Sequence, residues 1–159
     1  MLPMRFSVFG LIACGLIGCA HGKIPLTNID DTDENREILA IVKEYHKALE
    51  SLDADAILSL VSPRYFEDNG NLEAEDDYDF DGLRQALRED FKRTRSMKVN
   101  IRVDAIEVDD ETERAWAELY YQIHAQNEYP SGTKWETGSD RTRLRFERVQ
   151  GRWLIVAGL

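Results

Sequence analysis

The sequence predicts an α+β fold in which three helices precede an antiparallel sheet. Two observations support this class. Apolar residues recur at helical spacing in the first half of the domain, whereas the second half alternates between apolar and polar residues in runs separated by turn residues. Because the helices and strands are segregated along the chain, the pattern favours α+β over a parallel α/β arrangement.

The first helix is expected over about residues 34–51, where apolar residues recur every three or four positions. It begins after Asp31-Thr32-Asp33, whose side chains are suited to capping a helix and whose charges suit its positive end. A second, shorter helix is expected to begin after Asp53 and to end before Pro63. A third is expected over about residues 81–95, after an acidic loop at 67–81.

The remainder of the chain predicts four strands. Three of them alternate between apolar and polar residues, and the last is apolar on both faces, which is typical of a buried strand. Turn residues separate the later runs, at Pro130-Ser131-Gly132 and at Gln150-Gly151. The expected strands cover residues 99–103, 114–123, 141–146 and 153–156.

The first residues of the chain have the pattern of a secretory signal. Arg5 precedes a mostly apolar run over residues 6–17, which is too short to span a bilayer. The run ends in Leu16-Ile17-Gly18-Cys19, which resembles the lipobox of bacterial lipoproteins. This resemblance implies cleavage before Cys19 and lipidation of its thiol, so that acyl chains hold the protein to a membrane. The alternative is an ordinary signal peptide with a chance cysteine.

The expected domain organisation follows from this signal. Residues 1–18 form the signal peptide, residues 19–31 the lipidated cysteine and a tether, and residues 32–159 the folded domain. Ala20 follows the cysteine where an inner-membrane retention aspartate would stand, so the lipoprotein pattern implies the outer membrane, facing the periplasm.

The composition excludes several classes of function. The chain has 30 acidic and 20 basic residues, a formal net charge of −10, which disfavours nucleic acid as a partner. Cys14 lies in the signal and Cys19 would be acylated, which leaves no thiol for catalysis or for a disulfide. No cofactor motif is present. Residues 77–82 resemble the opening of a calcium loop, but Arg88 stands where the loop needs a glutamate, so no metal is predicted and an acidic helix start is favoured.

Several segments together resemble the nuclear-transport-factor-2-like superfamily, which includes ketosteroid isomerase and the polyketide cyclases. The resemblance extends over roughly residues 33–158. It implies a cone, in which the three helices close one mouth of a curved antiparallel sheet around an inner pocket. The fold hosts enzymes, binding proteins and assembly modules, so it leaves the function open. The segments that carry the resemblance are 44–49, 53–57, 65–68, 143–147 and 151–155.

The resemblance to ketosteroid isomerase implies three candidate catalytic residues. Tyr45 matches the tyrosine that donates a hydrogen bond to the developing enolate, and Asp68 matches the base that moves the proton. Thr142 stands where that enzyme has a protonated aspartic acid. A threonine is the weaker donor, and losing one of two oxyanion donors typically costs on the order of 10²-fold in rate. The alternatives are a core tyrosine at 45 and a turn carboxylate at 68.

Other aromatic residues suggest a pocket and an interface. Tyr65, Phe66 and Tyr121 are expected to line the inner pocket of the cone. A separate set shares the outer face of two neighbouring strands, and aromatic and arginine side chains favour interfaces. The alternative is a solvated face on which arginines pair with acids such as Glu118. The residues of the expected interface are Trp116, Tyr120 and Arg143.

These observations predict an envelope lipoprotein whose domain binds a small apolar ligand, or docks a protein partner or a second copy, without catalysis. The alternative is a proton-transfer enzyme of the isomerase or cyclase type, with Asp68 as general base and Tyr45 as oxyanion donor. Catalysis requires both side chains to face one closed cavity, a few ångströms apart. The enzyme hypothesis fails if Tyr45 packs flat in the core and Asp68 points to water.

Overall fold

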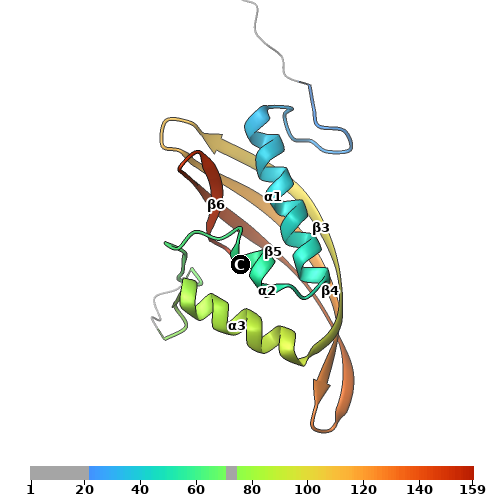
Figure 1. Ribbon diagram of the computed structural model, residues 1–159. Coiled ribbons are helices and arrows are strands. Elements are labelled where there is room, and N and C mark those ends of the chain that lie inside the picture. Colours follow the sequence, from blue (N-terminus) through green and yellow to red (C-terminus); the bar gives the residue numbers. More distant parts are fainter. Residues whose placement is uncertain (1–21, 71–74) are drawn as a thin grey trace, which may run out of the picture.

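The computed structural model describes residues 22–70 and 75–159, and the predicted signal peptide and Cys19 lie outside them. In the described residues, three helices lie on one side of a curved sheet, and the N-terminal segment and the β4–β5 hairpin are at opposite ends of the molecule (Figure 1). The elements are α1 (Asp33–Glu50), α2 (Ala54–Leu58), β1 (Phe66–Glu67), β2 (Tyr78–Asp79), α3 (Phe80–Arg93), β3 (Thr94–Asp109), β4 (Arg114–Tyr129), β5 (Gly132–Val149) and β6 (Arg152–Ala157).

The main sheet of the described residues is an antiparallel meander with the strand order β3-β4-β5-β6. Register shifts interrupt β3 between Val103 and Ala105 and the β5–β6 pair between Arg145 and Phe146. Such irregularities bend a strand and increase its twist, which helps the sheet to curve around the helices. The α+β class, the helices-first order and the curved antiparallel sheet are therefore as expected.

The helix starts are set by the side chains that precede them. Thr32 accepts a hydrogen bond from the Asn35 N–H, and Asp53 accepts one from the Ala56 N–H. Asp79 accepts two bonds, from the N–H groups of residues 81 and 82, at the start of α3. These side chains satisfy backbone donors that have no partner within the helix. The acidic stretch at 77–82 is thus a helix start in this structure.

The core lies between α1 and the inner face of the sheet. Alternate residues of β4 and β5 point inward, among them Ala117, Leu119 and Leu144, and they are almost fully buried. They pack with Ile38 and Val42 of α1 in one hydrophobic cluster. The other face of the sheet remains open to solvent, as the sequence alternation requires.

Both edges of the sheet are tied to the helical half of the domain. Ile155 in the last strand exchanges backbone hydrogen bonds with the segment after α2, donating to the Leu60 carbonyl and accepting from the Ser62 N–H. At the opposite edge, His46 Nε2 donates to the Val99 carbonyl over 2.6 Å, and Glu50 accepts from the Val99 N–H. These bonds occupy backbone groups that an open sheet edge would leave unpaired.

Part of the predicted tether belongs to the folded domain. Ile24 and Ile29 are buried and pack against Leu39 of α1, and a backbone bridge joins Lys23 to Asp30. The expectation of a tether through residue 31 is therefore corrected, because two isoleucines would otherwise leave apolar surface in water. The folded part reaches back at least to Gly22, whose carbonyl accepts from the Asp31 N–H.

The first and third helices begin and end within two residues of their predicted limits. The second helix begins as predicted but ends at Leu58, earlier than the limit set by Pro63, and the strands are longer than predicted. The predicted strand ends at residues 123 and 141 fall in the middle of a hairpin that continues to the turn at residues 130–131. Residues 132–141 are exposed, so this half of the hairpin has no apolar alternation to reveal it. The acidic loop predicted at 67–81 also contains the short β1–β2 pair.

We expect Gly158→Ala to destabilise the domain by about 2 kcal/mol or more. Gly158 has a φ of +97°, and a Cβ there would lie 2.2 Å from the Arg143 carbonyl oxygen, a distance that requires the backbone to move. Urea unfolding monitored by circular dichroism measures the change. Gly138→Ala is the control, because a Cβ at Gly138 would meet no atom within 4 Å. Equal stabilities of the two variants would contradict the prediction.

Candidate functional site

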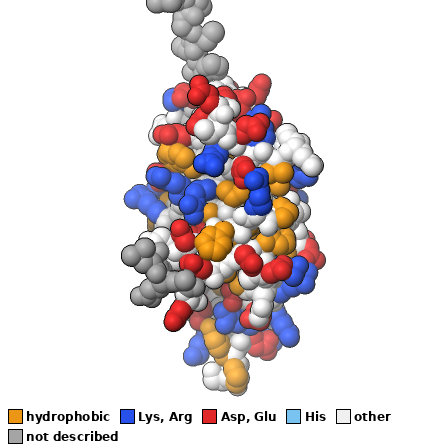
Figure 2. All heavy atoms as spheres, turned by 90° about the vertical axis from the view of Figure 1, so that its left-hand side faces the viewer, with side chains coloured by type: hydrophobic (Ala, Val, Ile, Leu, Met, Phe, Trp, Pro, Cys, Tyr) orange, Lys and Arg blue, Asp and Glu red, His pale blue; other side chains and the backbone are white. Residues whose placement is uncertain are grey.

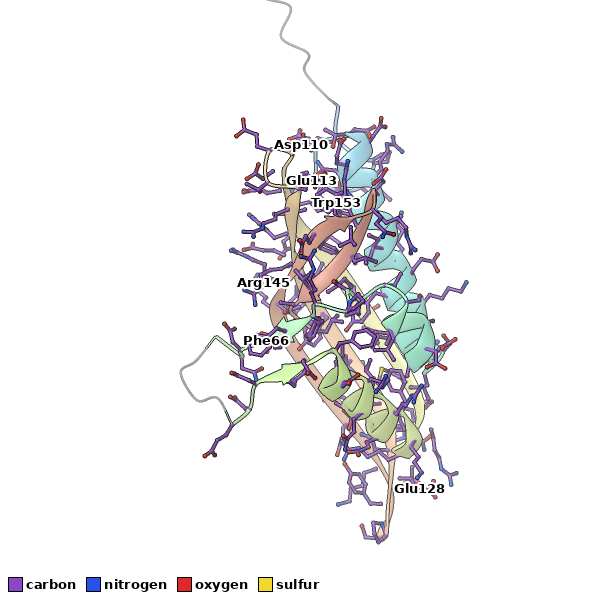
Figure 3. All side chains as sticks on the ribbon, turned by 60° about the vertical axis from the view of Figure 1, so that its left-hand side comes forward. Phe66, Asp110, Glu113, Glu128, Arg145 and Trp153 are labelled. Atoms are coloured by element: carbon purple, nitrogen blue, oxygen red, sulfur yellow. The ribbon has the colours of Figure 1, made fainter. Side chains whose placement is uncertain are left out.

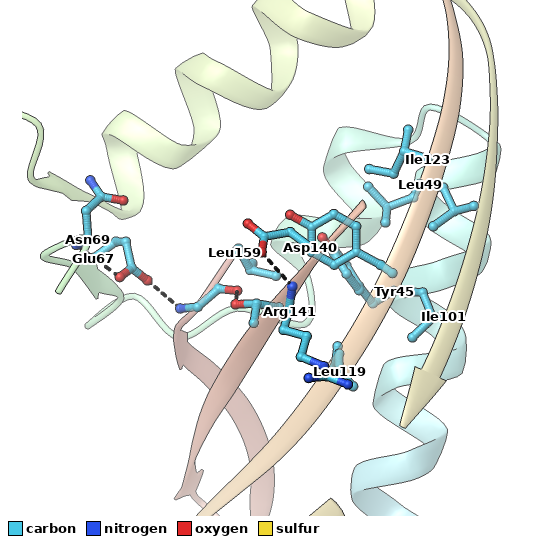
Figure 4. A pocket seen from close by; sticks show the side chains of 14 residues that line it. Tyr45, Leu49, Glu67, Asn69, Ile101, Leu119, Ile123, Asp140, Arg141 and Leu159 are labelled. Carbon is cyan, nitrogen blue, oxygen red and sulfur yellow. Dashed lines mark hydrogen bonds between the residues drawn. The ribbon is translucent and has the colours of Figure 1, made fainter. Parts of the chain in front are cut away.

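The inner face of the sheet and α1 line a cavity of about 420 Å³ that is partly open to solvent. This volume lies in the range of roughly 300–1,000 Å³ that is usual for small-molecule sites. Figure 4 shows its walls: α1 and the long strands on one side, the β1 segment on the other, and the end of the chain between them. The cavity is thus enclosed by segments that are far apart in the sequence.

The α1 wall presents one polar group, the hydroxyl of Tyr45. Tyr45 and Leu49 are four residues apart, so they lie on the same face of the helix and both line the cavity. Within the described part of the chain, the Tyr45 hydroxyl has no hydrogen-bond partner. Burial, and then the nearby hydroxyls of Tyr121 and Tyr78, raise the pKa of Tyr45 far above its usual value. Tyr45 is therefore a neutral phenol that can donate or accept a hydrogen bond in the cavity.

The sheet wall is mainly apolar, with a carboxylate near its edge. Ile101, Leu119 and Ile123 line it from β3 and β4. Tyr121 lies opposite Asp140 in the β4–β5 register, and both face the cavity. Burial, and secondarily the charge of Asp140, raise the pKa of Tyr121. The sheet wall is therefore an apolar surface with one charged group, Asp140, beside the ring of Tyr121.

The third wall is formed by the C-terminal segment, Gly158 and Leu159. Glu67 accepts a hydrogen bond from the Gly158 N–H over 2.5 Å, and Thr142 donates its hydroxyl to the Gly158 carbonyl over 3.0 Å. The Tyr78 hydroxyl donates to the Leu159 carbonyl over 2.6 Å. These bonds come from two sides of the cavity and hold the segment across it.

The placement of Asp68 differs from the prediction. Its side chain is half exposed, accepts from the Gly70 N–H and lies 3.8 Å from Arg145, on the outer side of the molecule. The carboxylate in the cavity is Glu67, which is buried. In the two-residue strand β1, Glu67 points inward, and the next residue points outward because side chains alternate. Asp68 and Tyr45 therefore do not face one cavity.

The remaining predicted site residues divide between the cavity and other places. Tyr121 and Thr142 line the cavity. Tyr65 instead lies in the core, where its hydroxyl exchanges hydrogen bonds with the Leu159 backbone, so it supports the wall from behind. Phe66 is about half exposed and points away from the cavity, as its neighbour Glu67 points into it. Figure 3 shows Phe66 and Arg145 on one side of the molecule and α1 on the other.

The predicted interface residues lie on the outer face of the sheet. Arg143 stacks over Trp116 at 4.4 Å and forms an ion pair with Glu118, so the expected charge pairing also occurs. Tyr120 lies beneath Arg102 and Arg141. Phe66, Trp116 and Arg143 also border an outer hollow of about 740 Å³. In Figure 2, basic and acidic side chains are intermingled with scattered hydrophobic ones on the face shown.

The sequence analysis missed Glu67 and Asp140. Glu67 stands directly before the residue that the resemblance selected, and only the direction of β1 distinguishes the two. Asp140 lies two residues before Thr142, on the same face of β5. Extending the predicted strand by one residue would have included it, and inward positions recur with a period of two, which places it on the face of Thr142.

In the described ranges, 22–70 and 75–159, no group of three or more histidine, cysteine or acidic residues could hold a metal ion. Over the same ranges, no helix is long and apolar enough to cross a membrane.

The comparison with protein families agrees with this architecture. The SnoaL-like domain matches residues 38–158, which extend from α1 to the C-terminal wall of the cavity. The chain belongs to the SnoaL-like family. This family includes isomerases, cyclases and ligand-binding proteins. Membership therefore accounts for the fold and the cavity but not for one activity.

Solved structures show the same fold at low sequence identity. The SnoaL-like domain resembles a conserved protein from Planctomyces limnophilus, with a TM-score of 0.66 and 14% identity over 79% of this chain and 92% of that one. A ketosteroid isomerase-like protein from Erwinia carotovora atroseptica gives 0.62 and 12%, covering 80% and 94%. An NTF2-like protein of unknown function from Pseudomonas putida also gives 0.62 and 12%, covering 79% and 83%. No curated protein matches the chain in sequence.

We expect Tyr45 to resist ionisation at high pH. Burial raises its pKa, so the phenol should stay protonated at about pH 11, where an exposed tyrosine is largely ionised. The measurement is a spectrophotometric pH titration of the wild type and of Tyr45→Phe. The two curves should coincide up to that pH. A tyrosinate signal near pH 10 that only the variant lacks would contradict the prediction.

Proposed function

We propose that this SnoaL-like domain binds a small, mostly apolar ligand in its inner cavity and does not catalyse a reaction on it. One observation carries the proposal: the cavity combines an apolar wall with the unpartnered hydroxyl of Tyr45. An apolar site with a few placed polar groups is the usual composition of a ligand pocket. A ligand with a polar group near Tyr45 would give that hydroxyl the partner it lacks.

The state of the other polar groups argues against catalysis. The oxygens of Glu67 accept hydrogen bonds from the Gly158 and Asn69 N–H groups, so this carboxylate already holds the wall together. The Thr142 hydroxyl is donated to the Gly158 carbonyl and is not free to stabilise an oxyanion. Asp68, the base expected from the sequence, faces solvent. Of the groups that proton transfer would need, Glu67 and Thr142 are therefore engaged in hydrogen bonds with the backbone, and Asp68 lies outside the cavity.

Proton transfer remains the second candidate, because Glu67 and Tyr45 line the same cavity. In this version Glu67 replaces Asp68 as the general base, and Tyr45 stays the oxyanion donor. Glu67 would have to accept a proton while it retains its bond to Gly158. The likeness to a ketosteroid isomerase-like protein supports this candidate only through the shared fold, because the two chains are 12% identical.

We further propose that acyl chains on Cys19 hold the domain at the outer membrane, facing the periplasm. The support is the charged start, the apolar run and the Leu-Ile-Gly-Cys ending of the sequence. Folded structure begins by Gly22, three residues after Cys19. The folded domain would then be held close to the membrane surface.

Ligand binding predicts that a small molecule co-purifies with the protein. We expect native mass spectrometry of the full chain, purified from its own host in mild detergent, to show a bound mass. Tyr45→Phe should lower its occupancy several-fold, because the ligand loses a hydrogen bond worth about 1 kcal/mol.

Tyr120→Phe is the matched control, since Tyr120 lies on the outer face. Protein without a small molecule, present instead as a dimer or with a protein partner, would refute cavity binding. It would favour the interface predicted at Trp116 and Arg143. Loss of the ligand in both tyrosine variants would show that Tyr45 is not its contact.

Lipidation predicts that cells fed a labelled fatty acid incorporate the label into this protein. Cys19→Ser should remove the label and release the protein from the membrane fraction, because each buried methylene contributes about 0.8 kcal/mol to anchoring. The control is Cys14→Ser, which alters the signal but not the acceptor. A Cys19→Ser variant that keeps its label would disprove acylation at this residue.

A further inference from the structure

The charged side chains that face the cavity are of one sign. Glu67 and Asp140 line it, and both are carboxylates. Arg141 also borders it, but its guanidinium is turned to the outer face, 5.9 Å from the Tyr120 ring and 3.9 Å from Asp104. Among the described residues, no cationic group points into the cavity. Its polar side is therefore negative.

The two carboxylates are not equivalent. Arg145 lies 4.0 Å from Glu67, on its outer side, and two N–H groups bind that carboxylate, so its charge is partly balanced. Asp140 accepts only the N–H of the next residue, and within the described residues no basic group lies within 4.0 Å of it. Asp140 is thus an unpaired charge at the solvent-exposed rim of the cavity.

Aromatic rings accompany this charge. Tyr121 lies directly across the β4–β5 ladder from Asp140, and Tyr45 lines the cavity from α1. Aromatic faces attract cations, with a strength of about 0.5–1 kcal/mol at exposed sites and more when the cation is desolvated. A neutral phenol can also accept a hydrogen bond from an N–H group. Carboxylate, aromatic face and phenol oxygen together match an ammonium group.

We propose that the cavity selects cationic ligands: amines with an apolar body, whose ammonium group lies between Asp140 and the Tyr121 ring. The body would occupy the wall formed by Leu119 and Ile123. This inference rests on the proposed ligand-binding function and specifies its ligand class. It assigns the Tyr45 hydroxyl the role of acceptor, and it makes Asp140 the residue that sets specificity.

The test compares three probes of one shape and different charge: benzylamine, benzyl alcohol and benzoate. They are titrated against the full-length protein in detergent at neutral pH, with ligand-observed NMR as the readout. We expect benzylamine to bind roughly fivefold more tightly than benzyl alcohol, as for a partly exposed ion pair, and benzoate to bind most weakly. High salt should reduce the preference for the amine, because salt screens exposed charges.

Asp140→Asn should remove the preference for benzylamine and leave the affinity for benzyl alcohol unchanged. The control is Asp68→Asn, which removes an equal charge outside the cavity and should keep the preference. The salt series tests the same point without a variant, in case Asp140→Asn folds poorly.

The outcomes separate this inference from the function on which it rests. If none of the three probes binds, the proposed ligand-binding function fails. If benzyl alcohol or benzoate binds as tightly as benzylamine, the cavity binds ligands but the selection of cations is wrong. If Asp140→Asn keeps the preference, or Asp68→Asn loses it, the ammonium group does not lie at Asp140.

Discussion

The alternation of β4 and β5 beneath α1 is the constraint on which the rest of this structure depends. Inward positions such as Leu119 and Leu144 are buried against the helix, and the positions between them face solvent. A slip of one residue in the register would exchange the two faces, so burial of the inner face fixes the register strongly. The same alternation decides which polar residues reach the cavity.

The cavity persists because its third wall is fastened by polar groups instead of being filled by apolar ones. Gly158 lies so close to the Arg143 carbonyl that no side chain fits there, and Glu67 and Thr142 bind its N–H and carbonyl. Polar bonds to a backbone segment hold it in one place without occupying the space beside it. The Glu67 carboxylate already accepts hydrogen bonds from backbone N–H groups. This distinguishes a glutamate with a structural role from one that is available as a general base.

The sequence predicted the helices and strands in which apolar residues recur at a regular spacing. Helical spacing located α1, and period-two alternation identified the strands and placed Tyr121 on the inner face. The resemblance to known proteins selected Tyr45, which does line the cavity, and Thr142. It could not choose between Glu67 and Asp68, because a two-residue strand has no pattern to fix its direction. Nor could it show that Tyr65 supports the wall from behind, since that depends on contacts 94 residues apart in the chain.

Strand β5 also separates charge across the thickness of the sheet. Asp140 faces inward, and Arg141, Arg143 and Arg145 face outward at alternate positions. The outer arginines form ion pairs with acids such as Glu118 or stack on Trp116, so neighbouring groups on the outer face balance their charge. Asp140 has no such partner among the described residues. Because Asp140 is exposed at the rim of the cavity, it acts on a ligand there as a charge that water and salt partly screen. Under the proposed selectivity, Asp140 attracts a cation that enters the cavity and repels an anion. The two-residue period of one strand is therefore enough to place a negative charge on the cavity side of the sheet and positive charges on the outer side.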